Sequence, residues 1–241
     1  MTNQNPPVSK PMGLLAAAAD LLLGAACPGC ATPGLGICDG CQERLLAQQP
    51  RLLPRPDFPV VSHGPYRPPV STLINAYKER EAWWLAKTLG AQLAAASAEL
   101  ITAGGLVILV PIPCDPQKIR ARGIDPMWRV GRSAQRILSH QAKLPEVRCV
   151  RLLRQTRQVA EQSALSRDQR WHNQAGALAV RPYPVPAAAQ VIIIDDISTT
   201  GATLSEAARA LTAARIPLLG GAVIADARIR AAQALGSERG R

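Results

Sequence analysis

Residues 191–203, with the sequence VIIIDDISTTGAT, carry two adjacent carboxylates followed by a turn rich in hydroxyl groups. The apolar, β-branched run predicts a buried strand, and open α/β sheets bind their ligands at the carboxyl ends of such strands. Backbone N–H groups of the turn and of a following helix would cradle an anion. Asp195 and Asp196 would repel each other unless a ligand satisfied them, and a vicinal diol offers the hydroxyl donors that paired carboxylates accept. A phosphate and a diol at this separation describe a ribose 5-phosphate.

The turn after the carboxylates has the composition of a phosphate-binding loop. Gly201 permits backbone angles that a side chain would oppose, and Thr203 with Glu206 has the spacing of a capping box, which predicts the start of a helix. An ordinary strand, turn and helix with solvated carboxylates is the alternative, whereas the P-loop lysine and the spaced glycines of a dinucleotide fold are missing. The residues expected to bind the phosphate are Ser198, Thr199, Thr200, Gly201, Ala202 and Thr203.

Two C-x2-C pairs lie near the N-terminus, Cys27 with Cys30 and Cys38 with Cys41. Each pair makes a tight knuckle that aims two thiolates at one point, and two knuckles supply the four thiolates of a structural zinc site. A module this small lacks a hydrophobic core, so the metal would supply its folding energy. A redox dithiol is the alternative interpretation.

Hydrophobic patterns around these motifs predict the elements that must position them. Continuous apolar runs predict strands at residues 106–113, 147–153, 190–195 and 218–225. Apolar residues at helical spacing predict helices at 71–101, with a break around 78–81, at 126–141 and at 203–215. Strands that alternate with helices favour an α/β fold with an open, mainly parallel sheet flanked by helices.

Composition divides the chain into three parts. Residues 1–12 are polar and proline-rich, which predicts a disordered tail. Residues 13–56 would hold a short helix, the cysteine module and most of a proline-rich linker at 50–59. Residues 57–241 would form the α/β domain.

The apolar run at residues 13–26 imitates a signal peptide, but it is too short to span a bilayer and Asp20 interrupts it. Its helical spacing favours an amphipathic helix that packs on the protein. We therefore expect no membrane span and a cytoplasmic location, where a reducing environment keeps the six cysteines out of disulfides. The isolated Cys114 and Cys149 are expected to be small buried or loop thiols.

Composition also restricts the class of partner. Apolar residues make up 47% and charged residues 19%, which is typical of a globular protein and excludes a disordered chain. The net charge of +11 favours an anionic partner, namely a phosphorylated metabolite, a nucleic acid or a membrane surface. An aromatic content of 3% leaves few rings for stacking on nucleobases.

The segment at 191–203 resembles the signature of the type I phosphoribosyltransferases, which bind 5-phosphoribosyl-1-pyrophosphate (PRPP). Together with the four cysteines before it, in a chain of this length, it resembles the ComF family of phosphoribosyltransferase-like proteins, which is linked to DNA uptake in competent bacteria. Further matches to that family are Leu73-Ile74 with Lys78, Val110-Pro111-Ile112-Pro113, Arg122-Gly123 and residues 162–173.

The resemblance implies which groups hold PRPP. Asp195 and Asp196 would bind the ribose hydroxyls, the turn would bind the 5-phosphate, and Mg2+ would accompany the ligand. Arg122 would act in catalysis with the two carboxylates. Residues 154–173 would form a mobile flap whose arginines, Arg154 and Arg170 among them, face PRPP.

The implied activity is transfer of a phosphoribosyl group, a glycosyltransferase reaction, to an undefined acceptor with release of pyrophosphate. Where the family has Phe-Asn-Gln after Arg-Gly, this chain has Ile124, Asp125 and Pro126, and an acidic residue there would repel the pyrophosphate. Two alternatives remain open: a protein of the DNA uptake machinery that handles single-stranded DNA alongside other competence proteins, and a PRPP-sensing regulator without catalysis.

Overall fold

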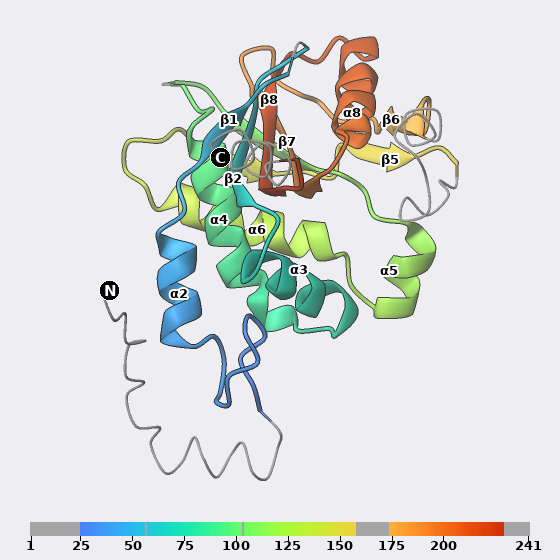
Figure 1. Cartoon of the computed structure of the whole chain (residues 1–241). Helices are drawn as coiled ribbons and strands as arrows, with labels where there is room; N and C mark the ends of the chain where they lie inside the picture. The colour runs from blue at the N-terminus through green and yellow to red at the C-terminus, as the bar shows by residue number, and fades with distance from the viewer. Residues whose placement is uncertain (1–24, 56, 103, 158–173, 229–241) are drawn as a thin grey trace, which may run out of the picture.

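The computed structural model describes residues 25–55, 57–102, 104–157 and 174–228. Its main sheet has six strands in the order β1-β2-β8-β7-β3-β4 (Figure 1). All neighbouring strands run parallel except β1 and β2, which confirms the prediction of an α/β fold with a mainly parallel sheet. The strands are β1 (Arg51–Leu53), β2 (Val60–Pro65), β3 (Val107–Pro111), β4 (Val147–Cys149), β7 (Gln190–Ser198) and β8 (Leu218–Asp226).

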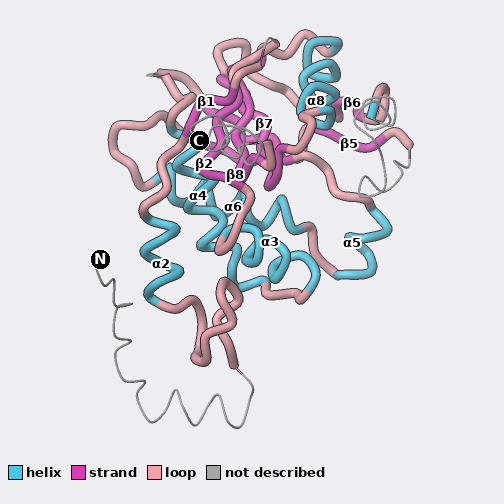
Figure 2. The backbone as a smooth tube through the Cα atoms, viewed as in Figure 1, coloured by secondary structure: helices cyan, strands magenta, loops and turns pink. Residues whose placement is uncertain are grey.

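Helices cover both faces of this sheet (Figures 1 and 2). One hydrophobic cluster joins α3, α4 and α6 to the sheet, and the other joins α8 and a small antiparallel sheet to the opposite face. The helices are α2 (Asp39–Leu46), α3 (Val70–Glu79), α4 (Ala86–Ala98), α5 (Pro116–Arg122), α6 (Pro126–Ser139) and α8 (Ala202–Ala213). The small sheet pairs β5 (Leu153–Gln155) with β6 (Leu178–Val180).

Strand β7 occupies an interior position of the sheet, between β3 and β8, because both of its faces are apolar. Ile192 and Ile194 belong to the cluster with α3, α4 and α6, whereas Val191 and Ile193 belong to the cluster with α8. This alternation follows from the two-residue period of a strand. The strand therefore delivers its polar end, from Asp195 onward, to the carboxyl edge of the sheet.

Two predicted segments fold differently from a simple reading of their patterns. The strand expected at 147–153 is divided, because β4 pairs with β3 while β5 leaves the main sheet to pair with β6. Leu152 and Leu153 are buried in the cluster with α8, whereas Val147 and Cys149 are buried in the cluster with α3, α4 and α6. The apolar run therefore packs on both sides of the main sheet. Within the predicted linker at 50–59, β1 forms an antiparallel edge strand on β2.

The helical region expected at 71–101 does contain two helices, α3 and α4, with a short 3-10 helix (Trp83–Leu85) between them. The predicted tail at 1–12, most of the helix expected at 13–26 and most of the flap lie outside the described residues. Within the described parts of the chain, no helix is both long enough and apolar enough to cross a bilayer.

Candidate functional site

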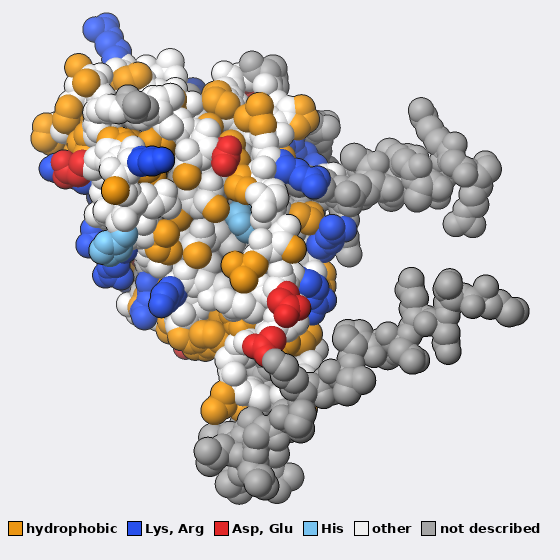
Figure 3. Space-filling model, turned by 90° about the vertical axis from the view of Figure 1, so that its left-hand side faces the viewer, with side chains coloured by type: hydrophobic (Ala, Val, Ile, Leu, Met, Phe, Trp, Pro, Cys, Tyr) orange, Lys and Arg blue, Asp and Glu red, His pale blue; other side chains and the backbone are white. Residues whose placement is uncertain are grey.

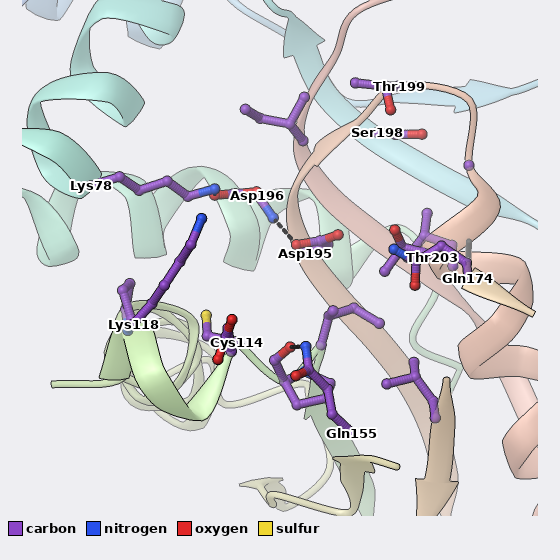
Figure 4. A pocket seen from close by; sticks show the side chains of 18 of the residues that line it. Lys78, Cys114, Lys118, Gln155, Gln174, Asp195, Asp196, Ser198, Thr199 and Thr203 are labelled. Carbon is purple, nitrogen blue, oxygen red and sulfur yellow. Dashed lines mark hydrogen bonds and ion pairs between the residues drawn. The ribbon is translucent and has the colours of Figure 1, made fainter. Parts of the chain in front are cut away.

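A cavity of about 820 Å3 lies at the carboxyl end of β7 (Figure 4). Its walls come from α3, the loop after β3, α5, β5, β7 and the turn before α8. Most of the residues predicted from the sequence to bind a phosphorylated sugar are therefore brought to one place. Those that line the cavity are Arg122, Asp195, Asp196, Ser198, Thr199, Gly201 and Thr203.

The carboxylate of Asp196 is paired with a lysine from the opposite side of the cavity. Lys78, in the last turn of α3, contacts Asp196 through Nζ, and Figure 4 shows the two side chains meeting. The backbone N–H of Asp196 donates to Oδ1 of Asp195 at 2.9 Å. The sequence did not reveal the contact between Lys78 and Asp196, because the two residues are far apart in the chain and meet only in the folded protein.

The two carboxyl groups differ in their electrostatic surroundings. Burial and the neighbouring charge of Asp196 raise the pKa of Asp195 to about 8, although Lys78 acts in the opposite direction. Burial alone would lower the pKa of Lys78, but the attraction of Asp196 and Asp195 outweighs it and raises that pKa. The site thus contains an ion pair next to a carboxyl group that resists ionisation, a combination typical of functional sites.

The turn between β7 and α8 leads through a left-handed glycine into the N-terminus of a helix. Gly201 has a φ of 85° and is the N-cap of α8, so the left-handed conformation expected for this glycine is present. The hydroxyl of Thr200 accepts from the backbone N–H of Ala202 at 3.3 Å, which turns it toward the loop itself. The hydroxyl-bearing residues that line the cavity are Ser198, Thr199 and Thr203.

The predicted capping box is wrong. Helix α8 begins at Ala202, after the cap residue Gly201, and its N-cap makes no side-chain hydrogen bond. Glu206 instead accepts from the backbone N–H of Leu178 at 3.0 Å and pairs with Arg209 at 2.7 Å. The glutamate is drawn away from the helix start because it ties α8 to β6, an interaction between segments that the local spacing cannot reveal.

Sequence reasoning missed Arg55, which lies in the predicted linker and reaches the phosphate-binding turn. Its guanidinium lies 3.4 Å from the hydroxyl of Ser198 and 3.4 Å from the carbonyl oxygen of Gly201. A Cβ on Gly201 would lie 1.3 Å from this guanidinium, so another residue here would displace the flexible end of Arg55 and would be strained in the left-handed backbone conformation. Burial, followed by the charge of Arg228, lowers the pKa of Arg55. A proline-rich linker offers no motif that would single this arginine out.

Further cations flank the ion pair. Arg122, for which the sequence suggested a catalytic role, lines the cavity and also pairs with Glu79 at 3.3 Å. Lys118 of α5 extends toward Lys78 and Asp196 in Figure 4. These side chains place positive charge on the side of the cavity opposite the turn.

Arg154 lines a second cavity of about 440 Å3 rather than the main one, and Arg170 lies outside the described residues. The two cavities share the loop after β3 and Gln155. The arginines around the second cavity are Arg120, Arg151, Arg154 and Arg181.

Asp125 also lines the second cavity, and its carboxylate is held by local partners. It caps α6 by accepting from the backbone N–H of Trp128 at 3.1 Å, and Pro126 occupies the first turn of that helix. Arg151 donates to the other carboxylate oxygen at 3.1 Å. Asp125 is therefore a helix cap with its own cation, and it does not line the main cavity.

The four paired cysteines form a cluster compatible with a structural zinc site. Their sulfur atoms all lie within 4.8 Å of one another, which is the donor set and spacing that tetrahedral zinc requires. Backbone N–H groups of Gly29 and Cys38 donate to the sulfur of Cys27 at 3.4 Å each. A Cβ on Gly29 would lie 2.8 Å from the sulfur of Cys41, so the knuckle depends on this glycine.

The cysteine cluster is attached to the α/β body through α3. The hydroxyl of Thr72 donates to the carbonyl oxygens of Gly29 at 2.7 Å and Pro69 at 2.8 Å. The knuckle is therefore held against the start of the helix whose last turn carries Lys78, which connects the candidate metal centre to the main cavity through one element.

Comparison of the sequence with models of protein families found no match, and comparison with curated proteins found no significant similarity. The geometry of the cavity and the chemistry of its side chains therefore have to carry the functional interpretation. The cavity brings two acidic side chains, a hydroxyl-rich turn and several cations together at the end of a parallel strand.

Proposed function

We propose that this protein is a type I phosphoribosyltransferase-like protein that binds PRPP and transfers its phosphoribosyl group to an acceptor. One observation carries the proposal: the carboxylates of Asp195 and Asp196 and the hydroxyl-rich turn line a single cavity. Carboxylates beside a hydroxyl-rich turn suit a ligand that has both a diol and a phosphate monoester. The open parallel sheet, with its ligand cavity at the strand ends, supports the same assignment.

In the proposed complex, the turn holds the 5-phosphate with backbone N–H groups and the hydroxyls of Thr199 and Thr203. Arg55 lies behind this turn and adds positive charge to it. Asp195 accepts from the ribose hydroxyls, and these donors favour its ionised form against burial and the charge of Asp196. Binding therefore fixes the sugar at both ends.

The transfer breaks the bond between the anomeric carbon and pyrophosphate, and the pyrophosphate leaves with the electron pair. Positive charge develops on the oxocarbenium-like ribose as the pyrophosphate departs. The acceptor donates an electron pair to the same carbon and loses its proton to water. Lys78, Lys118 and Arg122 line the cavity, and their charges would help to neutralise the leaving group. Mg2+ bound with PRPP would add further charge neutralisation, and the carboxylates are the residues suited to hold it.

The direct test is the stabilisation of the full-length protein by PRPP with Mg2+. Ligand at one hundred times its Kd stabilises a folded protein by about 2.7 kcal/mol, which raises the Tm of a chain this long by about 5 to 10 °C. We expect this rise in wild type and its loss in Asp195→Asn/Asp196→Asn. Glu99→Gln, an exposed acid distant from the cavity, is the control and should respond like wild type.

Asp195→Asn alone keeps the experiment decisive if the double variant fails to fold, because it preserves the Lys78 contact with Asp196. A wild type that does not respond, or a single variant that responds equally, would contradict the proposed site. Release of pyrophosphate in the presence of candidate bases or amines separates a transferase from a PRPP-binding regulator.

The arginine-lined second cavity favours one further candidate function, the binding of single-stranded DNA. Arginine contacts to phosphates make such binding steeply dependent on salt. A fluorescent oligothymidine should then bind wild type and Asp195→Asn/Asp196→Asn equally at low salt, and Arg154→Ala/Arg181→Ala weakly. Absence of oligothymidine binding at 50 mM salt would exclude this candidate.

A further inference from the structure

Gln174 is a buried amide side chain that lines the main cavity. Only 6% of this residue is exposed. Among the described residues its amide has no hydrogen-bond partner, and the amide atoms are not sealed off from the cavity. Buried polar groups are nearly always hydrogen-bonded in folded proteins. An unpartnered amide that faces a cavity is therefore suited to a direct contact with the ligand.

The chain after Gln174 fixes this amide beside the turn at the start of α8. The backbone N–H of Ala177 donates to the carbonyl oxygen of Gln174 at 3.0 Å, which closes a tight turn. The backbone N–H of Leu178 then donates to Glu206 of α8 at 3.0 Å. Glu206 lies one helical turn after Thr203, and Figure 4 shows Gln174 next to Thr203 at the cavity.

A second contact makes this placement rigid. The guanidinium of Arg209 donates to the carbonyl oxygen of Leu178 at 3.1 Å and also pairs with Glu206 at 2.7 Å. The segment that carries Gln174 is therefore attached to the first turns of α8 through both backbone groups of Leu178. The amide is held in place before any ligand binds, which reduces the entropy lost on binding.

The other groups around the turn indicate what this amide can contact. Lys78, Lys118 and Arg122 line the side of the cavity opposite the turn, and Arg55 contacts the turn from behind. A phosphate held by the turn would receive N–H groups from the helix start, and its oxygens on the cavity side would need further donors. A phosphate presents only acceptors, and a primary amide supplies an N–H donor without adding charge.

We propose that Gln174 is a further ligand-binding residue of the main cavity and donates its amide N–H to the phosphate monoester of the ligand. This inference rests on the proposed function, because it takes a sugar 5-phosphate to occupy the turn. The phosphate is then enclosed between the start of α8 and the segment before β6. Ribose 5-phosphate contains this phosphate without the pyrophosphate, so Gln174 contributes equally to the binding of ribose 5-phosphate and of PRPP.

Isothermal titration of the full-length protein with ribose 5-phosphate, and with PRPP and Mg2+, tests the inference. Gln174→Leu should raise both Kd values about tenfold, because one hydrogen bond to a charged group is lost. Gln174→Glu should raise them further, since a carboxylate at this position repels the phosphate. Gln141→Glu makes the same change at an exposed residue that lines neither cavity, and it should bind both ligands as wild type does.

The order of the affinities separates a phosphate contact from other roles. If the amide contacted ribose hydroxyls instead, a carboxylate would accept from them, and Gln174→Glu would bind at least as tightly as Gln174→Leu. Removal of an unpartnered amide should leave the ligand-free Tm of Gln174→Leu equal to or above that of wild type. Gln174→Leu alone keeps the test decisive if Gln174→Glu does not fold.

The outcomes distinguish this inference from the proposed function. If wild type binds ribose 5-phosphate and Gln174→Leu binds it equally, the inference is overturned and the proposed function stands. The same conclusion follows if Gln174→Glu binds at least as tightly as Gln174→Leu, or if Gln174→Leu has a lowered Tm, which would assign a structural role. Wild type that binds neither ribose 5-phosphate nor PRPP would overturn both.

Discussion

Asp195 is a carboxyl group whose ionisation the folded protein opposes. Burial and the adjacent Asp196 raise its pKa to about 8, far above that of an unfolded chain. This cost is borne by the ligand-free protein at neutral pH, and a ligand with hydroxyl donors would relieve it. The energetic penalty itself therefore supports a functional role.

The raised pKa of Asp195 predicts a specific dependence of stability on pH. The folded state keeps a proton that the unfolded chain has released, so stability is highest below the unfolded pKa and falls as pH rises through about 8. Between pH 6.5 and 8 we expect the free energy of unfolding to fall by up to about 1.4 kcal/mol per pH unit. Urea denaturation at several pH values in this range measures the free energy of unfolding.

Asp195→Asn should flatten this dependence and make the ligand-free protein more stable than wild type at pH 8. The window begins at 6.5 because burial lowers the pKa of His63, and protonation of that residue affects stability only at lower pH. If wild type and variant have the same slope, the carboxyl group titrates normally and the electrostatic description of the site is incorrect.

We expect Arg55 to contribute to PRPP affinity through its charge and not only through packing against the turn. Its guanidinium contacts the turn that we assign to the 5-phosphate. Arg55→Gln should raise the Kd for PRPP about tenfold, equivalent to about 1.4 kcal/mol, because one cation near the phosphate is removed. Calorimetric titration measures this effect, and Arg51→Gln on the exposed edge strand β1 is the matched control. Equal affinities for the two variants would show that Arg55 only supports the turn.

At the scale of elements, the two knuckles of the cysteine cluster differ in how tightly they are packed. Gly29 approaches the sulfur of Cys41 and the ring of Pro69, whereas a Cβ on Gly40 would meet nothing within 4 Å. Gly40 lies in α2, where alanine is favoured over glycine. The two glycines occupy the same place in the two C-x2-C pairs, but only Gly40 has space for a side chain.

Gly29→Ala should therefore displace the sulfur of Cys41 and weaken zinc binding, while Gly40→Ala should leave it unchanged or slightly improved. Competition with a chromogenic zinc chelator would report a Kd for zinc at least tenfold higher for Gly29→Ala. Similar zinc affinities for both variants, or purified wild type that contains no zinc, would contradict a structural zinc site at these cysteines.

At the scale of the whole molecule, the net charge of +11 has two opposing consequences. Lysine and arginine repel one another in the folded state, and blue side chains are spread across the face shown in Figure 3 with few red ones between them. The same charges attract a polyanion toward the cavities. Salt screens both interactions.

Raising KCl from 50 to 300 mM should therefore raise the Tm of the ligand-free protein by a few degrees and raise the Kd for PRPP several-fold. Fluorimetry without ligand and calorimetry with PRPP at each concentration measure the two responses. A PRPP affinity that does not change with salt would show that the arginines and lysines around the cavities do not act on the ligand.

The amino-acid sequence by itself determined the layers of the fold and the central motif. The apolar run of β7 specified a buried strand, the left-handed Gly201 specified a turn, and the cysteine spacing specified a cluster. These features are local, since strand period, turn conformation and knuckle geometry each depend on residues close together in the chain.

Only the tertiary structure decided which distant residues complete the sites. Lys78 reaches Asp196 because α3 packs beside the end of β7, and Arg55 reaches Gly201 because β1 joins the edge of the sheet. Glu206 leaves its expected capping role for β6, and Gln174 lines the main cavity because the chain that leads into β6 is held against α8. Such contacts depend on strand order and helix placement, which residue patterns within a single segment do not encode.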